Sequence, residues 1–135
     1  MARLYREAPL NGIWEGSGNI IALDVLRAAA KTPQSVSALL DEIRIAKGGD
    51  KRLDKAVSSL EAELRKPEEH EARARRIVER MAVALQASLL IRHSPRAVAD
   101  AFCATRLEGD GGVAYGSLPA GMGQRSIIER AHMSA

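Results

Sequence analysis

Apolar residues recur at three- and four-residue spacing along most of this chain, which is the period of an amphipathic helix. Proline, glycine and N-cap residues divide the pattern into segments. Thr32 followed by Pro33, Asp50 after a pair of glycines, and Ser94 followed by Pro95 are such boundaries. The pattern predicts helices over residues 17–31, 33–47, 51–64, 67–92 and 95–107, and a short helix over 124–130.

Each of the first three predicted helices carries one apolar stripe, and the fourth is apolar nearly all round in its second half, MAVALQASLLI. Such a helix is typical of a central, buried position. The second and third helices are expected to form an antiparallel hairpin, with the third contributing core residues rather than a dimerising zipper. The stripes are Ile20, Leu23, Leu26 and Ala30; Val36, Leu39, Leu40 and Ile43; and Leu53, Ala56, Val57, Leu60 and Leu64.

The composition favours an all-α fold of one domain. The chain has 135 residues, of which 46% are hydrophobic but only 3% aromatic, and Ala, Leu, Ile and Val make up most of the apolar set. We therefore expect an up-and-down bundle of about five helices with a glycine-rich tail. The expected divisions are a truncated upstream element with a turn (1–16), the bundle (17–108), and a glycine-rich loop with a short helix (109–135).

Net charge, cysteine content and the length of the apolar runs narrow the class of protein that the sequence encodes. The net charge is +3, from 20 basic and 17 acidic residues, which is too small an excess to indicate nucleic-acid binding by itself. The single cysteine, Cys103, lies in an apolar run and is expected to be buried and inert. The longest apolar run, residues 81–91, is too short to span a bilayer, and no signal peptide is recognisable, so a cytoplasmic protein without membrane contact is expected.

The turn WEGSGN, residues 14–19, is the candidate site for chemistry. Its glycines let the backbone approach another body, and Ser17 can begin a helix whose free N–H groups suit an anion or cofactor. Many glycine-rich turns, however, bind no ligand. A glutamate at a helix start, such as Glu15, is more often a partner of the helix dipole than a general base.

Three segments together resemble the acyl-CoA dehydrogenase family: RLYREAPLNGIWEGSGNIIALDVLRA, VADAFCATRLEGDGG and YGSLPAGMGQRSIIERA. In that family's C-terminal helical domain an aromatic-Glu-Gly-Ser/Thr turn precedes a helix. The AidB-type, alkylation-response branch is the nearer match. The three segments span almost the whole chain.

This resemblance implies a role for each residue of the turn. Glu15 matches the base that removes the α-proton of an acyl-CoA thioester while the β-hydrogen leaves as hydride to FAD, and Trp14 would help exclude water. The backbone N–H of Glu15 would hold the thioester carbonyl. Gly16 would border the substrate, and Ser17, Gly18 and Asn19 match positions that contact FAD.

The resemblance also implies a larger protein. The beginning of the chain reads as the end of an element, and members of the family have further domains upstream. We therefore expect a C-terminal fragment that is inactive by itself and does not retain FAD. Acyl-CoA and FAD are the expected partners of the complete protein, which would assemble as a homotetramer.

Arg73, Arg76 and Arg80 form a basic stripe on the predicted long helix. AidB-type proteins resemble DNA-binding proteins in using a basic C-terminal surface, so the alternative function is a non-catalytic helical module that binds DNA or a protein partner. An ordinary solvated face paired with Glu69, Glu71 and Glu79 is the simpler interpretation of the stripe. The three histidines are scattered, and no metal site is expected.

Overall fold

The computed structural model describes residues 2–12, 18–66, 70–108 and 121–131, and within these ranges the regular secondary structure is entirely helical. The elements are α1 (Ala2–Glu7), the 3-10 helix η1 (Ala8–Gly12), α2 (Gly18–Lys31), α3 (Pro33–Arg44), α4 (Lys51–Leu64), α5 (Ala74–His93), α6 (Arg96–Arg106) and α7 (Gln124–Ala131). The predicted all-α helical bundle is confirmed.

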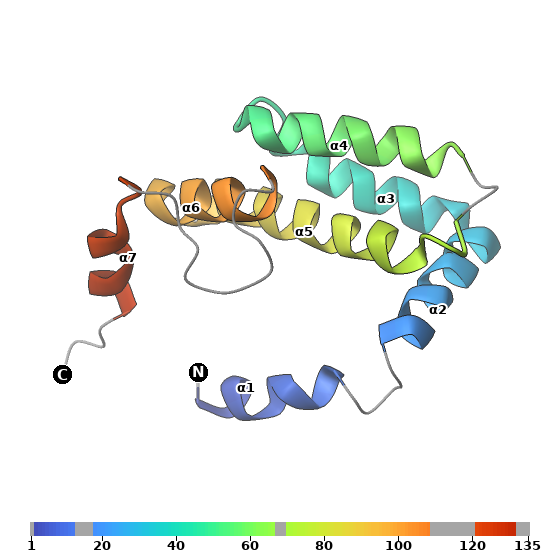
Figure 1. Cartoon of the computed structure of the whole chain (residues 1–135), viewed down its shortest axis with the longest axis horizontal. Helices are drawn as coiled ribbons and strands as arrows, with labels where there is room; N and C mark the ends of the chain where they lie inside the picture. Colours follow the sequence, from blue (N-terminus) through green and yellow to red (C-terminus); the bar gives the residue numbers. More distant parts are fainter. Residues whose placement is uncertain (1, 13–17, 67–69, 109–120, 132–135) are drawn as a thin grey trace.

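Helix α5 occupies the centre of the bundle (Figure 1). It packs against α2, α3, α4 and α6, as the apolar second half of the helix predicts. Its buried side chains are mostly small and follow helical spacing, which allows the neighbouring helices to approach closely. They are Ala74, Ile77, Met81, Ala84, Ala87 and Ser88.

The predicted apolar faces of α3 and α4 contribute to the core around α5, together with α6 and Ala22 of α2. Ile43 and Leu53 are fully buried in one cluster with Cys103, and Leu60 is buried in a second cluster with Ile77. Helices α3 and α4 run in opposite directions (Figure 1), as expected for the predicted hairpin. The leucines of α4 are therefore core residues.

The loop between α3 and α4 needs both of its glycines. Gly48 has a φ of +81°, which is a backbone conformation that side chains with a Cβ rarely adopt. At Gly49 a Cβ would lie 2.8 Å from Cγ2 of Ile91. The chain can therefore turn tightly against α5 before Asp50 caps α4 by accepting a hydrogen bond from the backbone N–H of Arg52 at 2.8 Å.

One prediction about local structure holds only in part and another is wrong. Of the predicted stripe of α2, Leu23 and Leu26 are half-buried, whereas Ile20 is 50% exposed and Ala30 is also exposed. Ala22, which lies outside the stripe, is buried, and Val25 packs against the second cluster. The long helix does not extend through residues 70–73, which form turns, and it begins at Ala74. Pro67 itself lies outside the described residues, as does most of the glycine-rich loop.

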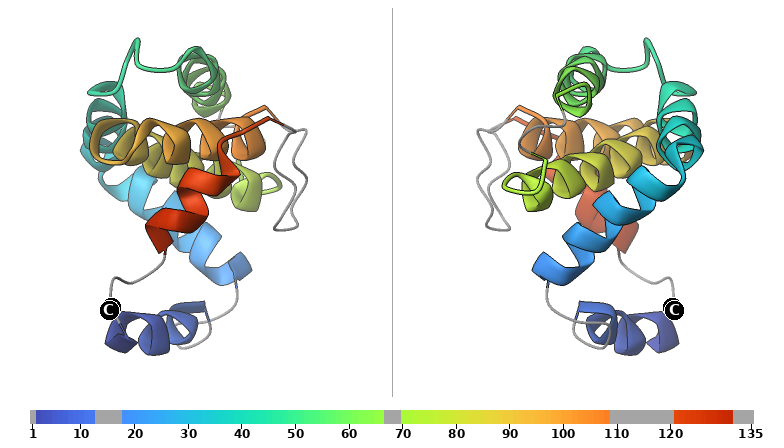
Figure 2. Two further views of the ribbon diagram at one scale, coloured as in Figure 1. Left: turned by 90° about the vertical axis from the view of Figure 1, so that its left-hand side faces the viewer. Right: turned by 90° about the vertical axis from the view of Figure 1, so that its right-hand side faces the viewer.

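The two ends of the chain lie away from the centre of the bundle. Figures 1 and 2 show α1 set apart from α3, α4 and α5, and α7 packs against α6. Leu4, Tyr5 and Leu10 are all more than half exposed. The division of the chain at residues 16 and 108 stays a prediction.

Candidate functional site

The predicted turn is described only at its junction with α2. Trp14, Glu15, Gly16 and Ser17 lie outside the described residues. Gly18 and Asn19 are the first two residues of α2, so the predicted start of this helix is correct to within one residue. The roles of Glu15, Gly16, Ser17, Gly18 and Asn19 stay predictions.

A cleft of about 510 Å³ lies beside the start of α2. Asn19 and Leu23 line it from α2, and residues 71–76 line it from the turn before α5 and from the first turn of that helix. Among these described residues are three arginines, Arg73, Arg75 and Arg76, and one glutamate, Glu71. The described lining of the cleft therefore carries more positive than negative side chains.

Arg75 extends from α5 toward α2. A Cβ at Gly18 would lie 3.8 Å from Nη2 of Arg75, so the guanidinium lies directly beside the first turn of α2. Among the described residues Arg75 has no carboxylate partner within ion-pair distance, unlike Arg73 and Arg76. Its five N–H donors are thus available to a ligand.

The predicted basic stripe is organised around a single buried carboxylate, Glu63 of α4, whose side chain is 6% exposed. Nη1 of Arg73 and Nε of Arg76 each lie 3.6 Å from Oε1 of Glu63, and Arg80 donates a short hydrogen bond to Oε2. Arg80 also donates to Oγ of Ser59 at 2.7 Å.

These contacts connect α5 to α4. Neither Glu71 nor Glu79, the partners expected from the sequence, pairs with the stripe, and Glu69 lies outside the described residues. We call Glu63 and these three arginines the Glu63 cluster.

Part of the stripe also borders a cationic groove between α4, α5 and α6. The groove has a volume of about 800 Å³. Its basic side chains are Lys51, Arg52, Lys55, Arg76, Arg80 and Arg106, and its acidic ones are Glu79 and Glu108. Lys51 and Lys55 are exposed and have no ion-pair partner among the described residues, so this part of the groove can attract a polyanion.

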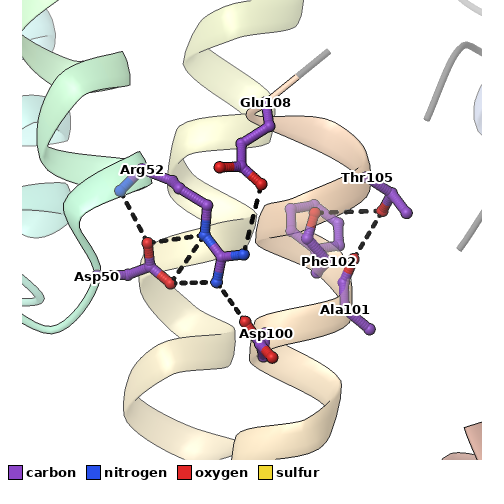
Figure 3. A network of polar contacts seen from close by, with 7 residues as sticks. All are labelled: Asp50, Arg52, Asp100, Ala101, Phe102, Thr105 and Glu108. Carbon is purple, nitrogen blue, oxygen red and sulfur yellow. Dashed lines mark hydrogen bonds and ion pairs between the residues drawn. The ribbon is translucent and has the colours of Figure 1, made fainter. Parts of the chain in front are cut away.

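A second charged cluster, which the sequence reasoning missed, connects α4 to α6 (Figure 3). Nη2 of Arg52 lies 2.6 Å from Oδ2 of Asp50 and 2.5 Å from Oδ1 of Asp100, and Nη1 lies 3.7 Å from Oε2 of Glu108. We call these four residues the Arg52 cluster. The one sequence signal for it was Asp50, which was recognised only as an N-cap.

The Arg52 cluster perturbs the titration of its members. The hydrogen bonds from Arg52 lower the pKa of Asp50 and, reciprocally, raise the pKa of Arg52. Burial, with the charge of Asp50 added, raises the pKa of the Cys103 thiol to about 11. The prediction that Cys103 is buried is confirmed, and the raised pKa disfavours the reactive thiolate.

The described residues contain neither a candidate metal site nor a membrane-spanning helix. No group of three or more histidine, cysteine, aspartate or glutamate side chains among them could hold a metal ion. Likewise, none of the described helices has the length and apolar character needed to cross a bilayer.

Comparison with known proteins identifies the class of protein. No family model matches the chain. A curated protein of Escherichia coli (strain K12), however, is 38% identical to it over 113 residues, which cover 84% of this chain. This similarity confirms the resemblance to the acyl-CoA dehydrogenase family. The relative carries the name "Putative acyl-CoA dehydrogenase AidB", and the chain spans about 20% of its length.

Proposed function

We propose that this chain is the C-terminal helical part of an FAD-dependent protein of the acyl-CoA dehydrogenase type, with Glu15 as the base that removes the α-proton of an acyl-CoA thioester. The observation that carries the proposal is the 38% identity to AidB over 113 residues. The helix beginning at Gly18, directly after the WEGS turn, supports it. The complete protein is expected to be a cytoplasmic homotetramer.

The chemistry follows from the residues of the turn. The carboxylate of Glu15 accepts the α-proton, and it needs a raised pKa and a substrate carbon within hydrogen-bond reach to do so. The backbone N–H of Glu15 polarises the thioester carbonyl, Gly16 borders the substrate, and Trp14 excludes water. Ser17, Gly18 and Asn19 contact FAD, which when bound supplies the acceptor for the β-hydride. Because the chain spans about a fifth of AidB, we do not expect it to catalyse the reaction by itself.

A chimera tests this proposal: the matching segment of AidB is replaced by this chain, and the product is assayed for bound flavin and for oxidation of isovaleryl-CoA. We expect the chimera to retain FAD. Glu15→Gln should keep the flavin but lower kcat by about 10²-fold or more, because a general base contributes about 10²–10⁴-fold. Glu7→Gln, which removes an exposed carboxylate of α1, is the matched control. A chimera without flavin, or full activity in Glu15→Gln, would contradict the proposal.

A non-catalytic module that binds DNA is the second candidate, and the cationic groove is the observation that favours it. Lysine and arginine side chains that contact phosphates release counterions, so such binding falls steeply as salt concentration rises. Arg73 and Arg80 are committed to the Glu63 cluster, and reversing their charge would also disturb the contact between α4 and α5. Lys51 and Lys55 are therefore better positions for a test.

For this candidate we expect the double variant Lys51→Glu, Lys55→Glu to weaken binding of a short DNA duplex and to reduce its salt dependence. The matched control is Lys31→Glu, at the end of α2 and outside the groove. Binding that is insensitive to salt, or that is equally weak in both variants, would exclude the groove as the DNA site.

A further inference from the structure

We propose that Arg75 is a cofactor-binding residue that holds the anionic diphosphate of FAD in the cleft between the starts of α2 and α5. This inference rests on the proposed function, because it takes FAD as the ligand of the turn. It adds a residue from a different helix, 56 positions after Asn19, which the turn motif does not contain. Only Gly18, Asn19 and residues of α5 and the turn before it are needed for the argument.

The first observation is the position of the Arg75 side chain. Its guanidinium lies beside Gly18, the first residue of α2, in a cleft that Asn19 also lines. Gly18 and Asn19 are the described residues that the family resemblance assigns to FAD. A ligand that contacts Gly18 and Asn19 therefore meets the guanidinium of Arg75.

The second observation is the balance of charge around the cleft. Arg73 and Arg76 share the carboxylate of Glu63, whereas Arg75 has no carboxylate partner among the described residues. The first turns of α2 and α5 contain no acidic residue, and Glu71 is the one acidic side chain among the described residues that line the cleft. A cation at such a place is unfavourable unless an anion lies between it and the helix start.

The third observation is the available space and chemistry. The cleft has a volume of about 510 Å³, and the planar guanidinium of arginine matches two phosphate oxygens with paired N–H donors. Asn19, which also lines the cleft, can add an amide donor. A diphosphate can accept hydrogen bonds from both side chains and pairs with the positive charge of Arg75, which a neutral ligand does not.

The test measures binding of FAD and of inorganic pyrophosphate to the 135-residue chain, with flavin fluorescence and amide chemical shifts as readouts. We expect both to bind reversibly, with shifts at Gly18, Asn19 and Arg75, but too weakly for the chain by itself to retain FAD through purification. Arg75→Gln should raise the Kd of each probe about tenfold by removing the paired hydrogen bonds. Arg96→Gln is the matched control, since Arg96 is also an exposed arginine in the first turn of a helix, and it should change Kd less than twofold.

The possible failures are distinguishable. Equal binding of FAD to Arg75→Gln and to the unchanged chain would overturn the role of Arg75 and leave the proposed function standing. The role of Arg75 would also be overturned if the chain bound pyrophosphate but not FAD. The same holds if the chain bound a DNA duplex through Arg75 but did not bind FAD. If the chain binds neither probe the inference fails, while flavin retention by the chimera still decides the proposed function independently.

Discussion

The Glu63 cluster and the Arg52 cluster lie at opposite ends of α4. Both consist of carboxylate–guanidinium ion pairs, but the central group is a carboxylate in the first and a guanidinium in the second. In the Glu63 cluster one carboxylate lies among three arginines and is nearly inaccessible to water. In the Arg52 cluster one guanidinium lies among three carboxylates, of which Asp100 and Glu108 are about half exposed. From this comparison we expect burial of the central group, more than the number of its partners, to determine how much stability is lost when that group is neutralised.

The largest expected effect is that of neutralising Glu63. Glu63→Gln leaves three arginines without their shared counter-charge. Removing one partner of a buried ion pair costs about 3–5 kcal/mol, and because these arginines are 28–65% exposed the expected cost lies at the lower end of that range. We expect a loss of that order in the free energy of unfolding, measured by urea denaturation. Glu79→Gln, an exposed change on α5, should cost less than about 0.5 kcal/mol. Equal stability of the two variants would show that the Glu63 cluster is a surface feature.

Removing Arg52 should have a smaller effect. Arg52→Met leaves Asp50, Asp100 and Glu108 near one another, but the latter two can be solvated. Loss of hydrogen bonds to a charged partner is worth about 1.5–3 kcal/mol, and partial exposure reduces this value. We expect urea denaturation to report a loss nearer the lower end of that range. A loss as large as that of Glu63→Gln would contradict the comparison.

The pH dependence of stability should be the smallest effect and should come from the Arg52 cluster. The folded-state pKa of Asp50 is lowered, so folded Asp50 binds protons less readily than unfolded Asp50, whose pKa is about 3.9. Its contribution is therefore fully present above about pH 4 and is lost as pH falls through the lower folded-state value. Urea denaturation between about pH 2 and 6 should show this loss.

Asp50→Asn provides the control for that measurement. An asparagine can still cap α4 but does not titrate, so the variant should lose less stability in acid than the unchanged chain. An identical acid dependence in both proteins would assign the effect to other carboxylates.

The sequence predicted the elements better than their ends. Pro33 and Asp50 fixed the starts of α3 and α4, because N-terminal signals act within a few residues. The glycines at 48 and 49 did not fix the end of α3, which lies at Arg44, three residues before the predicted end at residue 47. The predicted start of the long helix failed because residues 70–73 form turns in the structure. A ring nitrogen of His70 lies 3.1 Å from the backbone carbonyl oxygen of Glu63 in α4. Such a contact with another helix cannot be predicted from the helix propensity of residues 67–73.

Amino-acid order by itself determined that this chain is helical, where most of its helices begin and which faces of α3 and α4 are buried, because these depend on neighbours within about four residues. It also carried the turn motif and the similarity to AidB. Only the tertiary structure decided that Ala22 rather than Ile20 faces the core, that Glu63 gathers three arginines and that Arg75 meets Gly18. Each of these depends on a different helix approaching in space, and the spacing of residues along one helix contains no information about the charges on another.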